Sequence, residues 1–469
     1  MIDAGLLDPL AQGSRALDLT GDAAFLAAMV RAELALSRAL VDEGVAPEWM
    51  LGVCDGLETA GVDVAAIASS SRAGGNPVIP LVTRLGAAAD ALHDGASDHV
   101  HLGATSQDIL DTAAMLVARD VCDEVLARLH DAGAALAALV ETHRATPMVA
   151  RTLGQHAAPT TFGFVAAGWL DGVTTAIDLV DRARAGLPLQ LGGAVGSLAS
   201  LSRAATSRGS SADHVAAAVA RRLGLRVAPI AWHGSRAPVL TLASALAGAV
   251  AAVGVVALDV TVLARTEIGE VTERARGGSS AMPHKHNPVT AVLVHAAARR
   301  APQQLASLYG SALADDQRPT GAWHAEWLPL RELERTAISA AHGAATLAAG
   351  LDVDVARMAA NLELTGGLIY SEQVVAVLAE SVGHAAAFEL VGTASREAAR
   401  SGHPLAEVVA EAMAAGSYDR GVRDAVAAAF EGSAADGSAD TTSTAAADAA
   451  IDRVLAAFRA VTAPVGEAS

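Results

Sequence analysis

The sequence contains almost no lysine, cysteine or aromatic side chains. Its 469 residues include a single lysine (Lys285), two cysteines and only 3% aromatic residues. Two cysteines are too few for a disulfide framework or a cysteine-based metal site. We therefore expect Cys54 and Cys122 to be small buried side chains in a reducing compartment, and a core built from Ala, Leu and Val.

Positive charge is also scarce, and the formal net charge is −18. This argues against nucleic acid as a partner, because such binding depends on neutralising phosphates. The N-terminus lacks the basic and apolar regions of a signal peptide, so we expect a cytoplasmic protein. Residues 237–258 carry no charge and could span a bilayer by length. They are mostly small residues without an aromatic belt, which favours a buried bundle helix and no membrane contact.

Strong helix formers dominate the chain, and no convincing strand pattern is present. Apolar residues recur at helical spacing in six long segments, namely 23–41, 108–144, 161–185, 237–273, 289–313 and 330–351. The pattern predicts an all-α fold with a central long-helix bundle over 104–350. Helical domains are predicted on either side, at 1–103 and 351–469, the latter with a flexible linker at 431–446.

The single lysine lies in the densest polar segment of the chain. Residues 277–288 include a glycine pair, Ser279, Ser280, Met282 and Asn287 around Lys285. A lone lysine must fall somewhere, but a compact ammonium among these neighbours favours a site for an anionic group. The glycines give a loop that can open and close.

Two further polar segments precede apolar helices. The first contains His101, Thr105 and Ser106 within residues 99–108, and its Thr-Ser-x-Asp pattern is typical of a helix N-cap or of a carboxylate site at a helix start. The second contains Arg151, Gln155 and His156 within residues 151–163. His156 alone would more often be a structural histidine.

Together these segments resemble a known family. Ser279-Ser280-x-Met282-Pro283-x-Lys285-x-Asn287-Pro288 resembles the signature of the fumarase/aspartase superfamily, and the other two segments resemble its other regions in the expected order. Residues 361–372 resemble the C-terminal region of its adenylosuccinate lyase and cycloisomerase branch. The resemblance implies an all-helical homotetramer whose active sites are shared between subunits. It also implies a small polycarboxylate substrate and no metal or organic cofactor.

Within the family, residues 73–82, 191–196 and 321–327 are similar to 3-carboxy-cis,cis-muconate cycloisomerases. Fumarases and adenylosuccinate lyases carry a proton-transferring histidine after Thr152, where this chain has Leu153. The resemblance implies lactone formation from 3-carboxy-cis,cis-muconate in aromatic catabolism, by carboxylate addition and protonation next to a carboxylate. Two alternatives stay open. One is another lyase of the family, which either resembles adenylosuccinate lyase or releases an amine or nitrite from a substituted succinate. The other is a non-catalytic, crystallin-like protein.

The resemblance also implies roles for individual residues. Ser279 is the expected base, with Lys285 and loop N–H groups stabilising its alkoxide, and Asn287 and His156 complete the catalytic set. The expected substrate-binding residues are His101, Thr105, Ser106, Arg151, Gln155, Ser280, Met282 and Arg331.

Overall fold

The computed structural model describes residues 5–59, 61–275, 277–278, 280–431 and 441–462. Within these ranges the chain forms eighteen α-helices and four short strands, which confirms the predicted all-α class. The chain divides into two compact units that are discontinuous in sequence. The first unit is Met1–Leu129, Ala176–Gly254 and Leu293–Gly343, and the second is His130–Thr175, Val255–Val292 and Ala344–Ser469. The predicted division into three domains stays a prediction.

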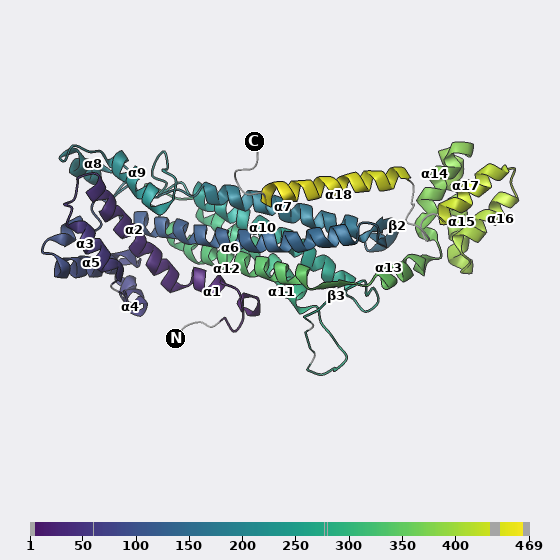
Figure 1. The fold of residues 1–469 in the computed structure, drawn as a ribbon, viewed down its shortest axis with the longest axis horizontal. Coiled ribbons are helices and arrows are strands. Elements are labelled where there is room, and N and C mark those ends of the chain that lie inside the picture. The colour runs from purple at the N-terminus through teal and green to yellow at the C-terminus, as the bar shows by residue number, and fades with distance from the viewer. Residues whose placement is uncertain (1–4, 60, 276, 279, 432–440, 463–469) are drawn as a thin grey trace. The chain divides into compact units, whose positions relative to one another are not determined.

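Short helices of the first unit form one group (Figure 1). Helix α2 (Asp22–Asp42) packs against α3 (Met50–Thr59) and α9 (Ala212–Leu223), α3 packs against α5 (Val78–Leu92), and α8 (Ala199–Thr206) packs against α9. The unit also contains α1 (Ala16–Thr20) and α4 (Val64–Gly74). Local sequence sets the limits of α4: the Asp63 carboxylate accepts the first free N–H groups, and Gly75 ends the helix at φ +71°.

Five long helices contribute residues to both units. They are α6 (Ser106–Thr142), α7 (Phe162–Ala185), α10 (Ala237–Leu263), α11 (Val289–Ser311) and α12 (Ala322–Ala349). Two of them, α7 and α10, are long and apolar enough to cross a membrane, and 56% of each apolar window is buried inside the protein. This burial fits the expected bundle helix, whose apolar side chains pack against neighbouring helices.

Two small antiparallel sheets in the second unit were not predicted. Strands β1 (Pro147–Thr152) and β2 (Gln155–Thr161) form a hairpin. Its two-residue tip, Leu153 and Gly154, has φ values of +51° and +79°, and hairpin turns of this kind need positive φ at both central positions. Strand β3 (Val271–Glu273) pairs with β4 (Leu351–Val353). The helical segment predicted over 237–273 is therefore too long, and α10 ends at Leu263.

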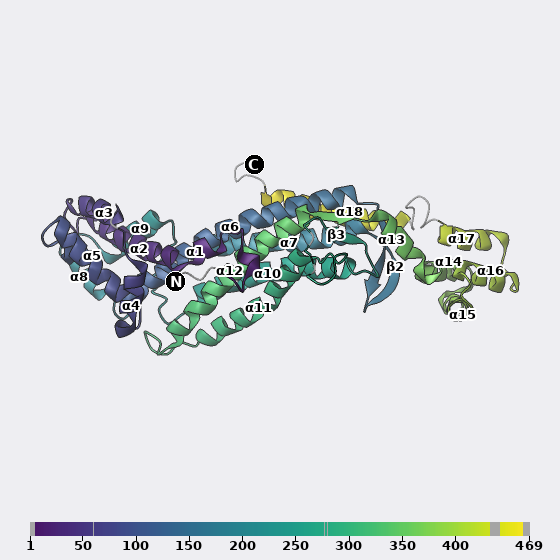
Figure 2. The same cartoon turned by 90° about the horizontal axis from the view of Figure 1, so that it is seen from below.

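The C-terminal part of the second unit contains α13 (Val355–Leu362) and a group of four short helices (Figure 2). These are α14 (Ser371–Val382), α15 (His384–Ser401), α16 (Leu405–Ala414) and α17 (Arg420–Glu431), around a core of Val, Leu and Ala side chains. Helix α18 (Thr441–Thr462) starts earlier than predicted, so 441–446 are helical and not linker. The remaining predicted linker residues, 432–440, lie outside the described residues.

Candidate active site

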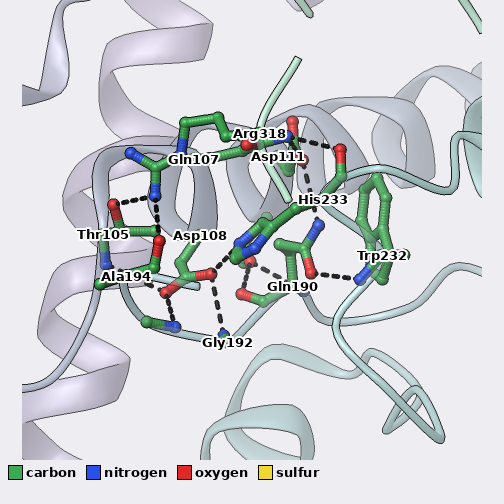
Figure 3. A network of polar contacts seen from close by, with 12 residues as sticks. Thr105, Gln107, Asp108, Asp111, Gln190, Gly192, Ala194, Trp232, His233 and Arg318 are labelled. Atoms are coloured by element: carbon green, nitrogen blue, oxygen red, sulfur yellow. Dashed lines mark hydrogen bonds and ion pairs between the residues drawn. The ribbon is translucent and has the colours of Figure 1, made fainter. Parts of the chain in front are cut away.

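The first polar segment starts α6 in the first unit (Figure 3). The backbone N–H of Thr105 donates to the Asp108 carboxylate at 3.0 Å, which is half of the reciprocal pattern that caps a helix start. Thr105 therefore sits at the cap position, as its sequence pattern predicts. Its hydroxyl is left available for other partners.

Asp108 is fully buried and fixes a distant loop against the start of α6. Its carboxylate accepts the N–H groups of Gly192 at 2.9 Å and Gly193 at 2.8 Å, and a ring nitrogen of His233 lies at 2.7 Å. The close approach requires glycine, because a Cβ on Gly192 would lie 2.5 Å from the Cβ of Ala231. Several donors around one carboxylate offset the cost of burying its charge.

A second buried acidic group lies one turn further along α6. Asp111 pairs with Arg236 at 2.9 Å and accepts the Trp323 indole N–H at 2.9 Å. Arg236 also pairs with Glu326. Burial alone would lower the pKa of the Arg236 guanidinium, but the two carboxylates outweigh it and raise that pKa. Burial raises the pKa of Glu326, and the charge of Arg236 opposes this shift.

Arg318 was not selected from the sequence, yet it lies directly beside the first polar segment. Its guanidinium donates to the Thr105 hydroxyl at 2.7 Å and to the carbonyl of Ala194 at 3.1 Å (Figure 3). Its side chain is exposed, and an exposed guanidinium next to a hydroxyl is a suitable ligand for a carboxylate. In the sequence, Arg318 lies in the short polar segment between α11 and α12, and that segment was the signal that could have identified Arg318.

Two of the other predicted residues of the first unit, His101 and Arg331, have partners within it. His101 Nδ1 lies 2.7 Å from Glu33, which is 1% exposed. Burial lowers the pKa of His101, but the hydrogen bond and charge of Glu33 outweigh it, so the net shift is upward. Ser106 is half-buried at the first position of α6. Arg331 donates to Asp22 at 2.6 Å and lies over the Phe25 ring.

The second polar segment forms the β1–β2 hairpin of the second unit. The Arg151 guanidinium makes two hydrogen bonds, of 2.7 and 2.8 Å, to the fully buried Glu270. Asn361 donates to the same carboxylate at 2.7 Å. The guanidinium expected to bind substrate is thus engaged by the chain's own carboxylate, and it ties the hairpin to β3 and α13. At the hairpin tip, the Leu153 side chain is fully exposed.

Next to this hairpin the second unit has a cavity of about 540 Å³. It is lined by residues 154–158 on one side and by residues between Leu364 and Glu372 on the other. Two buried polar atoms of lining residues have no hydrogen-bond partner among the described residues: Nδ1 of His156 and the hydroxyl of Thr365. Burial lowers the pKa of His156, and the charge of Arg151 lowers it further. Gln155 is exposed and donates to the carbonyl of Gly154.

The lysine segment is a loop whose base is closed by a pair of backbone hydrogen bonds. Gly277 and Asn287 exchange them at 3.1 and 2.9 Å. Gly277 is required there, because a Cβ would lie 2.0 Å from Cγ2 of Val289. Beyond this base, the side chains of Ser280, Met282 and Lys285 are exposed. The expected base, Ser279, lies outside the described residues.

The three polar segments thus lie in two different units of the chain. Among the described residues, no three His, Cys, Asp or Glu side chains come together in a way that could hold a metal ion.

Comparison with known proteins identifies the family. A family model described as "Lyase" matches residues 49–302. The chain is 49% identical over 417 residues to a nitrosuccinate lyase of Streptomyces davaonensis, with 88% of each chain covered. It is 39% identical over 410 residues to a 3-carboxy-cis,cis-muconate cycloisomerase of Bradyrhizobium diazoefficiens, covering 86% of this chain and 89% of the relative.

Solved structures agree with these sequence matches. The crystal structure of 3-carboxy-cis,cis-muconate lactonizing enzyme from Pseudomonas putida has a TM-score of 0.86 and 32% identity, covering 98% of this chain and 100% of that one. The helical fold and the three polar segments thus define a lyase-type enzyme. The chain belongs to the fumarase/aspartase superfamily, as the resemblance implied.

Proposed function

We propose that this enzyme is a nitrosuccinate lyase that converts 2-nitrosuccinate into fumarate and nitrite. The base removes a proton from the carbon next to one carboxylate, and that electron pair forms the new C=C bond. The C–N bond at the neighbouring carbon breaks, and its electron pair leaves with nitrite. The observation that carries this proposal is the 49% identity to a nitrosuccinate lyase, against 37 to 39% for the cycloisomerases.

The hairpin tip supports this choice of leaving group. Hydroxide and amines are strong bases, and an enzyme that expels them must supply a proton as the bond breaks. Nitrite is the anion of an acid that is already ionised at neutral pH, so it can leave without a proton. Leu153 cannot transfer one, and its fully exposed position at the tip suits a site that needs no acid there.

Charge placement supports a dicarboxylate substrate. Arg318 and the Thr105 hydroxyl form one candidate carboxylate site in the first unit. Lys285, exposed on its loop, provides a second cation that can meet the charge developing on the other carboxylate. In this reaction scheme Ser279 is the base, and Asn287 hydrogen-bonds the substrate without adding charge.

We further propose that the active site is completed by assembly into a cytoplasmic homotetramer. The polar segments lie in two units, and the hairpin presents its tip residue to solvent. Large apolar side chains on α7, α10 and α11 are exposed in the single chain, including Phe164, Val255, Leu258 and Val292. Such side chains are a normal feature of faces that subunits bury against one another. Light scattering on the purified protein measures the subunit number directly.

The test is turnover of 2-nitrosuccinate by the purified protein, followed by fumarate absorbance and by colorimetric nitrite release. Equal amounts of both products are expected, and Ser279→Ala should abolish them while leaving the thermal unfolding unchanged. A folded protein that releases neither product would exclude the proposal.

Cycloisomerisation is the second candidate, and the full-length similarity to the Pseudomonas putida lactonizing enzyme favours it. Internal addition of a carboxylate also needs no acid at Leu153. Loss of the conjugated diene absorbance of 3-carboxy-cis,cis-muconate would identify this activity. The ratio of kcat/KM for the two substrates decides between the candidates.

A further inference from the structure

The helix that follows the lysine loop, defined as residues 277–288, has no local capping side chain. Helix α11 starts at Val289, and the preceding Pro288 carries no side-chain acceptor. The first N–H groups of a helix have no acceptor within the helix itself. The N–H of Val289 reaches the carbonyl of Asn287 at 2.9 Å. The N–H groups of Thr290 and Ala291 still need acceptors from another part of the chain.

Glu273, at the end of β3, supplies both of these acceptors. Its two carboxylate oxygens accept the N–H of Thr290 at 3.1 Å and the N–H of Ala291 at 2.8 Å. The Glu273 residue is 4% exposed, and the two N–H groups offset the cost of burying its charge. A carboxylate is also stabilised by the partial positive charge at a helix N-terminus. Glu273 therefore caps α11 from a position 17 residues before Thr290.

The same contact holds the two ends of the lysine loop together. Glu273 precedes the loop in the chain, and α11 follows it. The backbone pair between Gly277 and Asn287 forms a second connection, closer to the loop in sequence. The entering side belongs to β3, which is fixed by its pairing with β4. The leaving side is joined to that strand by the Glu273 carboxylate, so this carboxylate sets where the loop ends.

We propose that Glu273 is a positioning residue for Lys285. Lys285 lies in the leaving side of the loop, two residues before Asn287, so displacement of the helix start would displace its ammonium group. Glu273 acts through the backbone, because both of its carboxylate oxygens are engaged by N–H groups. The inference rests on the proposed function for the role of the ammonium group, whereas the attachment of the loop is independent of the reaction.

Cleavage of the native full-length protein by a lysine-specific endoproteinase measures the attachment directly. Lys285 is the single lysine, so this protease can cut the chain at one place only. Cleavage needs a locally detached segment, and its rate therefore reports how often this end of the loop leaves its stem. Glu273→Ala should raise the cleavage rate about tenfold or more, because hydrogen bonds to a charged acceptor are lost.

Steady-state kinetics, with whichever of the two candidate substrates is turned over, gives the second measurement. Glu273→Ala should lower kcat about tenfold and keep KM within about twofold of the wild type, because Glu273 acts on the reaction only through the loop. Glu273→Gln keeps the shape of the side chain and one of the two acceptors. Its kcat and cleavage rate should lie between those of the wild type and Glu273→Ala, and it serves as the test if the alanine variant fails to fold.

Asp63→Ala is the matched control. The Asp63 carboxylate likewise accepts two N–H groups, at 2.9 and 3.2 Å, but it caps α4 in the first unit. This variant should keep wild-type kcat and wild-type cleavage at Lys285. Unchanged cleavage in a folded Glu273 variant, or faster cleavage with unchanged kcat, would overturn the proposal. Faster cleavage in a protein that turns over neither substrate would remove the proposed function and leave the loop attachment established.

Discussion

Glu334 should make this protein less stable as the pH rises. Its side chain is fully buried in α12, and neither carboxylate oxygen has a hydrogen-bond partner within the described ranges. Burial raises the pKa of Glu334 from 4.5 to about 8, although the charge of Arg331 opposes the shift. The folded protein therefore holds this carboxyl neutral at pH 7, whereas the unfolded chain ionises it.

The sign and size of the effect follow from proton linkage. Between about pH 4.5 and pH 8 the folded state binds one more proton than the unfolded state, so the free energy of unfolding falls as pH rises. At about 1.36 kcal/mol per pKa unit, the full loss is about 5 kcal/mol and is complete above pH 8. Because the side chain is fully buried within the single chain, no second subunit can contact it.

Glu334→Gln removes the titration and keeps the shape of the side chain. We expect its unfolding free energy, measured by urea denaturation at fixed protein concentration from pH 5 to pH 9, to lack this pH-dependent loss. The variant should therefore be several kcal/mol more stable than the wild type at pH 9, with a small difference at pH 5. Glu332→Gln is the control, because its carboxylate is exposed and contributes about 1 kcal/mol or less. Parallel pH curves for wild type and Glu334→Gln would refute the reasoning.

Three further variants test the candidate site. Arg318→Ala should raise KM for the dicarboxylate at least about tenfold in steady-state assays, because the substitution removes a charged hydrogen-bond donor. Thermal unfolding should not change, because the side chain is exposed. An unaltered KM would exclude Arg318 from substrate binding. Gly277→Ala should reduce kcat more than about tenfold, because the added Cβ collides with Val289. Gly278→Ala is the control and should retain near-normal activity, because the space around its Cβ is open. Equal kcat values for the two variants would show that the backbone pairing at the base of the loop does not matter for catalysis. Glu270→Gln should lower the unfolding free energy by about 3 kcal/mol in denaturant titrations, since it leaves the partly buried Arg151 guanidinium without a charged partner. An unchanged midpoint would contradict that role.

Helices with strong periodicity were predictable to within a few residues. Residues 23–41 and 161–185 were expected, and α2 and α7 span Asp22–Asp42 and Phe162–Ala185. Helix α12 begins at Ala322, eight residues before the predicted start at 330, because Pro329 inside the helix looks like a boundary in the sequence. The hairpin escaped prediction because its strands are short and alternate poorly, and its register depends on the tip geometry.

The site was predictable only where the signal was local. Thr105 and Asp108 are three residues apart, and their spacing predicted the cap that forms. The contact of Arg318 with Thr105 joins residues 213 positions apart, and sequence spacing carries no information about it. In the same way, Arg151 looked free in the sequence, whereas Glu270 engages it 119 residues away.

Asp108 links these local and distant features into one arrangement. Its carboxylate accepts the N–H of Thr105, and its own N–H donates to the Thr105 carbonyl at 2.9 Å, so the threonine hydroxyl is not needed for the cap. The same carboxylate holds the N–H groups of Gly192 and Gly193, which places the adjacent Ala194 carbonyl where Arg318 can reach it. The guanidinium is thus positioned by two acceptors that Asp108 itself orients. A carboxylate buried for structural reasons therefore sets the geometry of the exposed cation that we propose binds the substrate.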